Sequence, residues 1–361
     1  MGFKKFVVKL LLFLPLGLAA IGVSYIVDPW HLMKGKQYYR KNARMLLSGK
    51  CLGNTYSLGP IQRILKASVI EAFDSKRQVV VLGSSRTQGI RAESFPSLTF
   101  FNNSLSGAGI EDSMCTYWMY RKKKILPSVV VFGVDPWIVN KDNRKDFFEV
   151  TGNEYTELMG CLSGVELSQK PVFLDSYESY SLGLLFSPTY FKMSLRRLPW
   201  YISGGRNDLY EVSGKNNQGW ILHPDGSLVN YEAAGNGEMK KVETDSERMA
   251  MADELIGEFQ AIEKTRFEKF SSLIIKDKVR LMFYLPPFSP ATYKLLLKAE
   301  KYKIIKEVQS YFEDYARKNK VEIRGSYDPA YYGLTEADFE DGFHAKWESI
   351  KKKFEQENGL R

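Results

Sequence analysis

A set of short runs, made almost wholly of β-branched and other apolar residues, constrains this chain more than any other feature. Besides Val79-Val80-Val81-Leu82, such runs occupy residues 98–101, 129–132, 279–285 and 321–323. Strands that are apolar on both faces are typical of a parallel sheet covered by helices. Apolar residues at helical spacing predict helices between several of these runs, over residues 61–73, 112–124, 246–270 and 293–318. The alternation predicts an α/β fold, a three-layer sandwich with a central, mostly parallel sheet.

The composition agrees with a folded chain of this size. The 361 residues are 44% hydrophobic and 14% aromatic, which excludes an intrinsically disordered protein. At roughly 150 residues per domain, the chain has room for one large domain or two smaller ones. We expect the main α/β domain over residues 76–350, preceded by a connecting region over residues 28–75.

The N-terminal segment has the pattern of a transmembrane helix. Lys4 and Lys5 precede an apolar run over residues 6–27, and residues 10–27 carry no charge. As a helix, the uncharged part extends roughly 27 Å, close to the ~30 Å hydrocarbon core of a bilayer. The basic flank predicts that residues 1–27 cross the cytoplasmic membrane once, with the N-terminus inside and the α/β domain on the periplasmic or extracellular face. A cleaved signal peptide is the alternative.

Residues 141–245 interrupt the alternation of strands and helices. This long insertion is rich in Tyr, Phe and Trp, and Pro224-Asp225-Gly226 separates two apolar runs as the turn of an expected hairpin. Because aromatic faces pack against sugar rings, the insertion is a candidate lid or glycan-binding surface. Ordinary packed structure is the alternative.

Several kinds of site are excluded by the residue counts. Cys51, Cys115 and Cys161 are too few and too scattered for a disulfide scaffold or a zinc site, and the three histidines lie far apart. No glycine-rich nucleotide motif follows a strand, so we expect neither a cofactor nor a metal. The net charge of +9 is dispersed, which outside a membrane favours an anionic membrane surface or envelope polymer over nucleic acid.

A serine-containing turn follows the first central strand. The run that ends at Leu82 continues as Gly83-Ser84-Ser85-Arg86. Ligands of parallel α/β sheets bind beyond the carboxyl ends of the strands. A turn at this place can present a serine hydroxyl together with a backbone N–H that stabilises an oxyanion. A tight turn without chemistry is the alternative.

A histidine follows an aspartate by three residues near the C-terminus, in Asp341-Gly342-Phe343-His344. The carboxylate of Asp341 can orient one ring nitrogen of His344, which leaves the other nitrogen to face a serine from elsewhere in the chain. A surface histidine beside acidic residues is the alternative. The other two histidines, His31 and His223, are expected at the surface.

Two more segments carry polar residues after strands, over residues 101–108 and 131–137. In chain order, the four segments resemble the SGNH/GDSL hydrolase superfamily. They are most similar to its membrane-anchored, polysaccharide-modifying branch, which includes the SGNH-like proteins of alginate O-acetylation and the D-alanyl transfer protein of teichoic acids. The resemblance covers residues 76–140 and 275–350.

The resemblance implies a role for each matching residue. Ser85 corresponds to the nucleophile, His344 to the general base and Asp341 to the group that orients it. The backbone N–H of Ser85 corresponds to one oxyanion donor, and Gly83 and Gly107 are candidates for the pocket.

Three positions depart from the family pattern. Ser84 replaces its aspartate, Ser104 stands at its oxyanion glycine, and Asp135 stands at its asparagine. An ionised carboxylate cannot donate a hydrogen bond to an oxyanion, so Asp135 is either protonated or structural, as a cap on the turn before Pro136. Arg86 either binds an anionic group of the substrate or forms a structural salt bridge.

The function that the resemblance implies is acyl transfer to a cell-envelope polysaccharide through an acyl-Ser85 intermediate, with acetyl as the expected group. It also implies a multipass membrane acyltransferase as the partner that supplies the acyl group. Two alternatives stay open. One is a carbohydrate esterase or deacetylase with the same triad, and the other is a non-catalytic accessory protein of an acylation complex.

Overall fold

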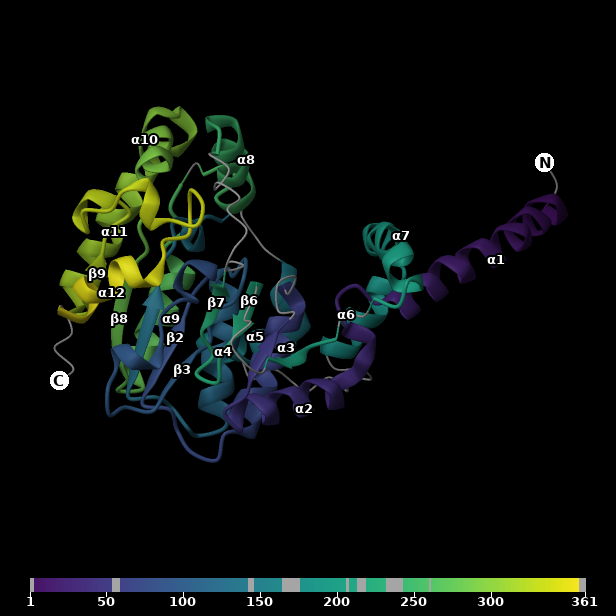
Figure 1. Ribbon diagram of the computed structural model, residues 1–361, viewed down its shortest axis with the longest axis horizontal. Coiled ribbons are helices and arrows are strands. Elements are labelled where there is room, and N and C mark those ends of the chain that lie inside the picture. Colours follow the sequence, from purple (N-terminus) through teal and green to yellow (C-terminus); the bar gives the residue numbers. More distant parts are fainter. Residues whose placement is uncertain are drawn as a thin grey trace.

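One parallel sheet forms the centre of the molecule, as Figure 1 shows. The computed structural model describes residues 3–53, 59–141, 146–163, 176–205, 208–212, 219–231, 243–259 and 261–356. Within these residues the strands of the main sheet, in spatial order, are β3 (Phe100–Asn102), β2 (Val79–Leu82), β4 (Val129–Gly133), β8 (Arg280–Leu285) and β9 (Glu322–Gly325). Every neighbouring pair runs parallel, which confirms the predicted α/β fold with a mostly parallel sheet.

The two faces of the sheet belong to two separate cores. Val80, Val130 and Leu281 lie side by side on neighbouring strands and belong to the larger core. Val79 and Val131 belong to the smaller one on the opposite face. Since successive side chains of a strand point to opposite faces, a strand buried on both faces must be apolar throughout.

Helices cover the two faces unequally. The larger core includes residues of α3 (Gly59–Ala72), α4 (Ile110–Lys122), α9 (Thr265–Lys276) and α11 (Ile304–Asn319). The smaller core includes residues of α12 (Trp347–Gln356), together with irregular segments around Phe95 and Phe339. Both faces are thereby withdrawn from solvent.

Two segments predicted as single helices are each divided in two. Residues 246–270 form α8 (Asp245–Leu255) and the first part of α9, because Gly257 turns the chain at a φ of +68°. Residues 293–318 lie in α10 (Pro290–Lys298) and α11, with a 3-10 turn over Glu300–Tyr302 between them. Both breaks fall within a continuing apolar pattern, so the periodicity alone predicted unbroken helices.

A smaller antiparallel sheet joins segments that are distant in the sequence. Its described strands, in spatial order, are β5 (Tyr210–Val212), β1 (Cys51–Gly53), β6 (Gly219–Leu222) and β7 (Leu228–Tyr231). The pairing of β6 with β7 confirms the predicted hairpin. Since β1 comes from the connecting region and the other strands come from the insertion, these two parts of the chain share one sheet.

The hairpin turn is fastened to the edge of the main sheet. The N–H of Asn102, at the end of β3, donates to the carbonyl of Asp225 (2.8 Å). The buried ammonium of Lys66 donates to the carbonyls of Asn102 (2.9 Å) and Gly226 (3.1 Å). These bonds hold the hairpin beside the carboxyl ends of the strands.

The N-terminal helix α1 (Phe3–Val27) extends away from the α/β body, and α6 (Ser176–Leu185) and α7 (Pro188–Ile202) lie near its C-terminal part (Figure 1). In the body, α2 (Gly35–Leu47) packs on α3, and α5 (Gly152–Ser163) packs on α4. No single helix in the described part of the chain has both the length and the hydropathy of a membrane span. Two consecutive helical segments, residues 13–27 and 32–47, reach the required length and hydropathy only when taken together, and they are bent by 83° relative to each other. The single-pass anchor therefore stays a prediction.

Candidate active site

Ser85 is presented by a tight turn at the end of β2. Gly83 is required in this turn, because its φ is +148° and a Cβ there would lie 2.7 Å from Thr87 Oγ1. Ser84 Oγ accepts the N–H of Arg86 (3.1 Å) and so caps the 3-10 turn η2 (Ser85–Thr87). The side chain of Ser85 stays half-buried at the edge of a cavity.

His344 is brought to Ser85 by a loop that Asp341 folds. Asp341 Oδ1 accepts the N–H groups of Phe343 (2.7 Å) and His344 (2.8 Å). Asp341 Oδ2 lies 2.8 Å from His344 Nδ1, and His344 Nε2 lies 2.8 Å from Ser85 Oγ. The structure thus brings together all three residues predicted as the triad, and each contact is within hydrogen-bonding distance.

The charges of the site favour an aspartate that stays ionised. Burial raises the pKa of Asp341, but the bond to His344, the charge of that ring and two backbone N–H groups outweigh burial and bring the pKa to about 2. Burial lowers the pKa of His344, whereas the hydrogen bond and the charge of Asp341 raise it, and the net pKa is raised above 6.5. Such a histidine accepts a proton readily near neutral pH.

The loop of His344 is held by residues that no sequence pattern marked. The N–H of Gly342 donates to Glu243 Oε2 (2.9 Å), and its carbonyl accepts the N–H of Ser289 (3.0 Å). Phe343 is fully buried and packs edge-on against Phe288, with ring centroids 5.5 Å apart. Glu243 and Ser289 reach the loop only through the tertiary fold, and their spacing in the chain gives no signal of it.

Arg86 connects the serine turn to the histidine loop. Its guanidinium bonds Asp135 Oδ1 (2.8 Å), the carbonyl of Phe343 (3.0 Å) and the carbonyl of Pro286 (2.6 Å). The guanidinium also lies 4.1 Å from the ring centroid of Phe288. Of the two interpretations of Arg86, the structure supports the structural salt bridge.

Asp135 is the counterion of Arg86 and does not cap the turn before Pro136. The side chain of Asp135 makes no capping hydrogen bond to the 3-10 turn Pro136–Val139. The side chains of Arg86 and Asp135 are 1% and 0% exposed, so the ion pair is removed from solvent. The expected cap is therefore wrong. The ion pair with Arg86 favours the structural alternative for Asp135, and burial raises the pKa of this carboxyl.

Ser104 is unsuitable as the oxyanion donor that the resemblance implied. Its N–H already donates to Asn102 Oδ1 (2.8 Å), and its hydroxyl accepts from Thr87 Oγ1 (2.7 Å). Ser104 is fully buried, and neither it nor Gly107 lines the cavity beside Ser85. The N–H that Ser104 would offer to an oxyanion is thus already engaged, while the candidate role of Gly107 stays a prediction.

The backbone N–H of Ser85 remains a candidate oxyanion donor. Ser85 is the first residue of η2, a position whose N–H has no acceptor within the helix. Gly83 does not line the cavity. Its carbonyl accepts the N–H of Leu105 (2.9 Å), which holds the serine turn against the loop after β3.

The triad opens into a cavity of about 390 Å³ between the hairpin and the C-terminal segment. The hairpin contributes side chains that sequence analysis did not assign individually, among them Trp220, Asn230 and Tyr231. Arg91 also lines the cavity and is half-buried there. This part of the insertion therefore lies at the candidate site.

The other two histidines are occupied elsewhere. His31 is buried, contrary to the predicted surface position, and burial lowers its pKa to about 4. His223 Nε2 lies 3.0 Å from Tyr231 Oη, and burial lowers the pKa of His223. The His31 ring is therefore neutral at pH 7, and neither ring contacts Ser85.

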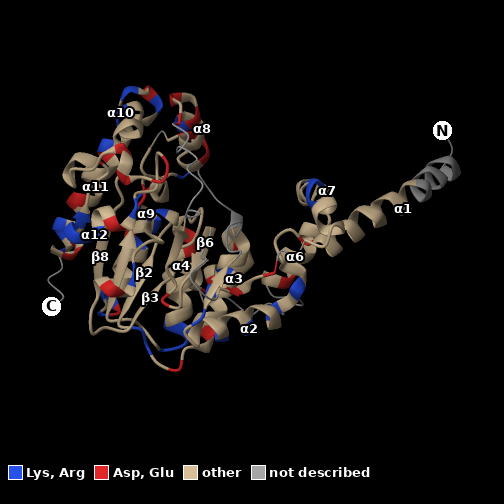
Figure 2. Ribbon diagram, viewed as in Figure 1, with Lys and Arg blue, Asp and Glu red and all other residues tan. Residues whose placement is uncertain are grey.

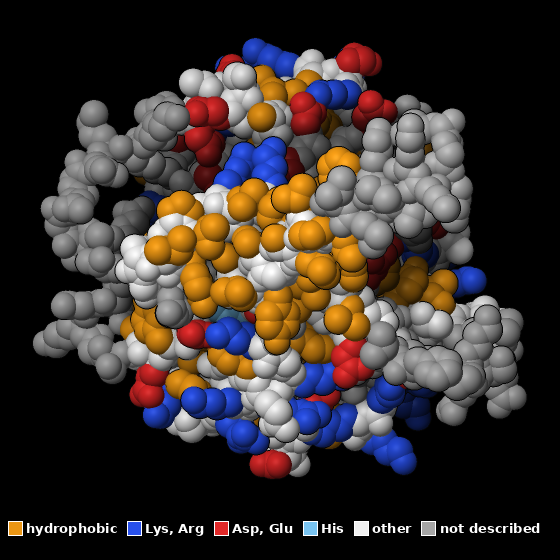
Figure 3. Space-filling view, turned by 90° about the vertical axis from the view of Figure 1, so that its right-hand side faces the viewer, with side chains coloured by type: hydrophobic (Ala, Val, Ile, Leu, Met, Phe, Trp, Pro, Cys, Tyr) orange, Lys and Arg blue, Asp and Glu red, His pale blue; other side chains and the backbone are white. Residues whose placement is uncertain are grey.

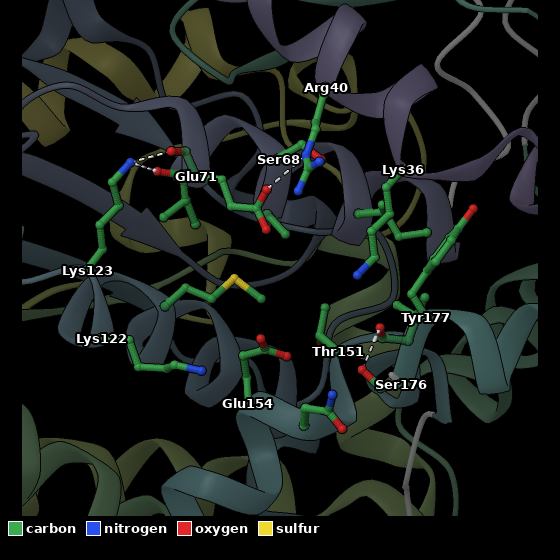
Figure 4. A pocket seen from close by; sticks show the side chains of 16 residues that line it. Lys36, Arg40, Ser68, Glu71, Lys122, Lys123, Thr151, Glu154, Ser176 and Tyr177 are labelled. Atoms are coloured by element: carbon green, nitrogen blue, oxygen red, sulfur yellow. Dashed lines mark hydrogen bonds and ion pairs between the residues drawn. The ribbon is translucent and has the colours of Figure 1, made fainter. Parts of the chain in front are cut away.

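A second cavity of about 410 Å³ lies away from the triad, and Figure 4 shows its lining. Its cations already have partners, since Arg40 pairs with Glu71 (3.5 Å) and Lys122 pairs with Glu157 (2.7 Å). Lys123 donates to the carbonyl of Ile70 (3.0 Å). We assign this cavity no part in the chemistry.

Among the residues that the structure describes, no group of three or more His, Cys, Asp and Glu side chains is placed to hold a metal ion. No protein-family model matches the sequence, and no curated protein matches it either.

The raised pKa of His344 gives a direct test of its contact with Asp341. The Asp341→Asn variant removes the charge that raises the pKa, while burial of the ring remains, so we expect the pKa of His344 to fall below 6.5. NMR titration of the three histidine rings measures this, and His31→Gln and His223→Gln variants assign the signals. A His344 pKa unchanged in Asp341→Asn would contradict the contact.

The ion pair of Arg86 and Asp135 predicts a large, non-additive effect on stability. Arg86→Met leaves a buried carboxylate without its counterion and should lower the free energy of unfolding by about 3–5 kcal/mol. The double variant Arg86→Met/Asp135→Leu should lose less free energy of unfolding than the sum of the losses in the two single variants. Chemical denaturation measures all of these variants.

The exposed pair Lys303–Glu300 supplies the matched control. Lys303→Met should change the free energy of unfolding by less than about 1 kcal/mol. An Arg86→Met effect no larger than this control, or strict additivity in the double variant, would show that the buried pair does not hold the site.

Proposed function

We propose that this protein is a serine-dependent acyltransferase that moves an acyl group, with acetyl as the expected one, to a hydroxyl of a cell-envelope polysaccharide. The observation that carries the proposal is the chain of contacts from Ser85 Oγ to His344 Nε2 (2.8 Å) and from His344 Nδ1 to Asp341 Oδ2 (2.8 Å). Ser85 and His344 are 259 positions apart, and their contact faces a cavity at the carboxyl ends of the strands.

The first half of the reaction forms the acyl-enzyme. Ser85 Oγ attacks the carbonyl carbon of an acyl ester or thioester donor, and His344 Nε2 takes the hydroxyl proton. The Ser85 N–H stabilises the tetrahedral oxyanion. Collapse of this intermediate breaks the bond to the donor's leaving group, which receives the proton from His344, and leaves the acyl group as an ester of Ser85.

The second half transfers the acyl group. A sugar hydroxyl gives its proton to His344 and attacks the ester carbonyl. Collapse then breaks the bond to Ser85 Oγ, which regains the proton, and releases the acylated sugar. Asp341 stays ionised throughout, keeps Nδ1 protonated and stabilises the imidazolium that forms in each half.

The lining of the cavity supports a polysaccharide acceptor. Its volume of about 390 Å³ lies within the usual range of small-molecule sites, roughly 300–1,000 Å³. Trp220 and Tyr231 offer aromatic surfaces for sugar rings, and Asn230 offers an amide for hydroxyl groups. Arg91 supplies a cation for an acidic group, so we infer that an anionic polysaccharide is the preferred acceptor.

The order of the four segments along a mostly parallel sheet also supports the SGNH-like interpretation. The uncharged apolar run over residues 10–27 and the lysines before it support a single-pass anchor with the α/β domain outside the cytoplasm. In that location the acyl group has to arrive across the membrane, for which we propose a multipass membrane acyltransferase as the donor partner.

Ser85→Ala should abolish the activity, because it removes the attacking oxygen. With p-nitrophenyl acetate as donor and a de-acetylated uronate polysaccharide as acceptor, we expect transfer by the full-length wild type and a loss of at least about 10³-fold in the variant. The acetyl content of the recovered polysaccharide is the measurement, with a neutral polysaccharide as a second acceptor.

Ser349→Ala is the matched control, since Ser349 lines the same cavity without contacting His344. It should retain the activity of the wild type. Release of acetyl to water alone at every polysaccharide concentration would identify an esterase. Full transfer by Ser85→Ala would contradict the covalent mechanism and favour the accessory protein.

A further inference from the structure

The end of α1 is packed against α7 by specific contacts. Tyr190 Oη donates to Asp28 Oδ1 (2.7 Å), and the Tyr190 ring meets Trp30 edge-on with centroids 5.3 Å apart. Ser194, one turn further along α7, is fully buried. One face of α7 therefore packs against the C-terminal part of α1 and the turn that follows it.

This packing covers one side of the last two turns of α1. Residues 13–19 are exposed and residues 20–23 are half-buried. Ser24 and Val27 are buried, while Tyr25 and Ile26 on the other side of the helix remain exposed. The uncharged residues before position 20, residues 10–19, extend only about 15 Å as a helix, short of the ~30 Å hydrocarbon core. If α1 crosses the membrane, as the proposed function assumes, its last two turns and the helix packed on them must lie at the level of the outer leaflet.

Exposed apolar side chains gather at this end of the molecule. Among the described residues, eleven of the fourteen large hydrophobic side chains that are exposed lie on α1, α6, α7 or their connection, and the others are Tyr210, Ile275 and Tyr331. Phe186, between α6 and α7, is 73% exposed, and Ile202 at the end of α7 is 74% exposed. Figure 3 views this end and shows hydrophobic side chains gathered across the middle of the face.

The outer face of α7 combines apolar and basic residues. Leu195 and Trp200 are exposed on it together with the cations Lys192 and Arg196. Figure 2 shows Lys and Arg positions in blue on α7. Glu178 is the only acidic residue between positions 176 and 202. Basic amphipathic helices with Trp and Leu on their apolar side lie in the interface of anionic membranes.

We propose that α6 and α7 form a second membrane contact, which lies in the headgroup region of the outer leaflet beside α1. Leu195, Trp200 and Ile202 enter the boundary with the acyl chains, and Lys192 and Arg196 face anionic headgroups. A single helix leaves the attached domain free to rotate about the helix axis. A second contact restricts that rotation and holds the α/β domain in one orientation relative to the lipid surface.

Spin labels test the depth of this face in the full-length protein. Leu195→Cys and Ile202→Cys are labelled in a Cys51→Ser/Cys161→Ser background, in nanodiscs of phosphatidylethanolamine with phosphatidylglycerol. Ile275→Cys on α9 is the control, since Ile275 is exposed on the α/β body. We expect the two α7 labels to collide more with oxygen than with a water-soluble nickel chelate, and the control label to show the reverse.

Removing the basic charges tests the choice of lipid. Lys192→Gln/Arg196→Gln should reduce the ratio of oxygen to nickel collisions at position 202, and phosphatidylglycerol should then no longer affect that ratio. A ratio that depends equally on phosphatidylglycerol with and without these cations would contradict the contact with anionic headgroups.

Two results would overturn the membrane contact. Labels at 195 and 202 that are as open to the nickel chelate as the control would place α7 in water. Labels shielded from both reagents would show that a protein covers the face. Extraction of membranes with alkaline carbonate separates this failure from a failure of the anchor. Release of the wild-type protein would contradict the transmembrane anchor itself. Retention of the protein with water-exposed labels would contradict only the membrane contact of α6 and α7.

Discussion

The buried ion pair of Arg86 with Asp135 is the interaction on which the geometry of the site depends. Arg86 follows Ser85 directly, and its guanidinium also holds the carbonyl of Phe343, the residue before His344. A guanidinium has several donors and no acceptor, so one side chain can bond one carboxylate oxygen and two carbonyls at once. Serine and histidine come from opposite ends of the domain, and this side chain sets the position of one relative to the other.

The parallel sheet explains why the partners meet at all. The carboxyl ends of β2, β4 and β8 lie at one edge, where Ser85, Asp135 and Pro286 emerge. The histidine loop arrives there from beyond the last strand and needs support of its own, which Glu243 and Ser289 supply through Gly342. The hairpin, fastened to β3, closes the other side of the cavity. The candidate triad and the side chains that line its cavity thus come from different segments around one sheet edge.

The sequence was informative where a local pattern has one structural outcome. Wholly apolar β-branched runs predicted the parallel strands, and a serine turn after one of them, with an aspartate three residues before a histidine, predicted the triad. Prediction from the sequence failed where a contact between distant parts of the chain determines the local structure. The N–H of Ser104 is taken by Asn102, Gly257 ends a helix within a continuing apolar pattern, and β1 pairs with strands of the distant insertion. The sequence could not identify Arg86 as the partner of Asp135, because the spacing of two strand ends does not show which polar side chains will face each other.

The central claim is that Ser85 becomes acylated when His344 is neutral. The most direct measurement is the rate at which p-nitrophenyl acetate acetylates the protein as a function of pH, with the modified residue located by peptide mass spectrometry. We predict a single acetylated residue, Ser85, and a rate that falls as the pH drops through the pKa of His344, which lies above 6.5 because Asp341 raises it. Acetylation at another residue, or at Ser85 with no dependence on the ionisation of His344, would contradict the account.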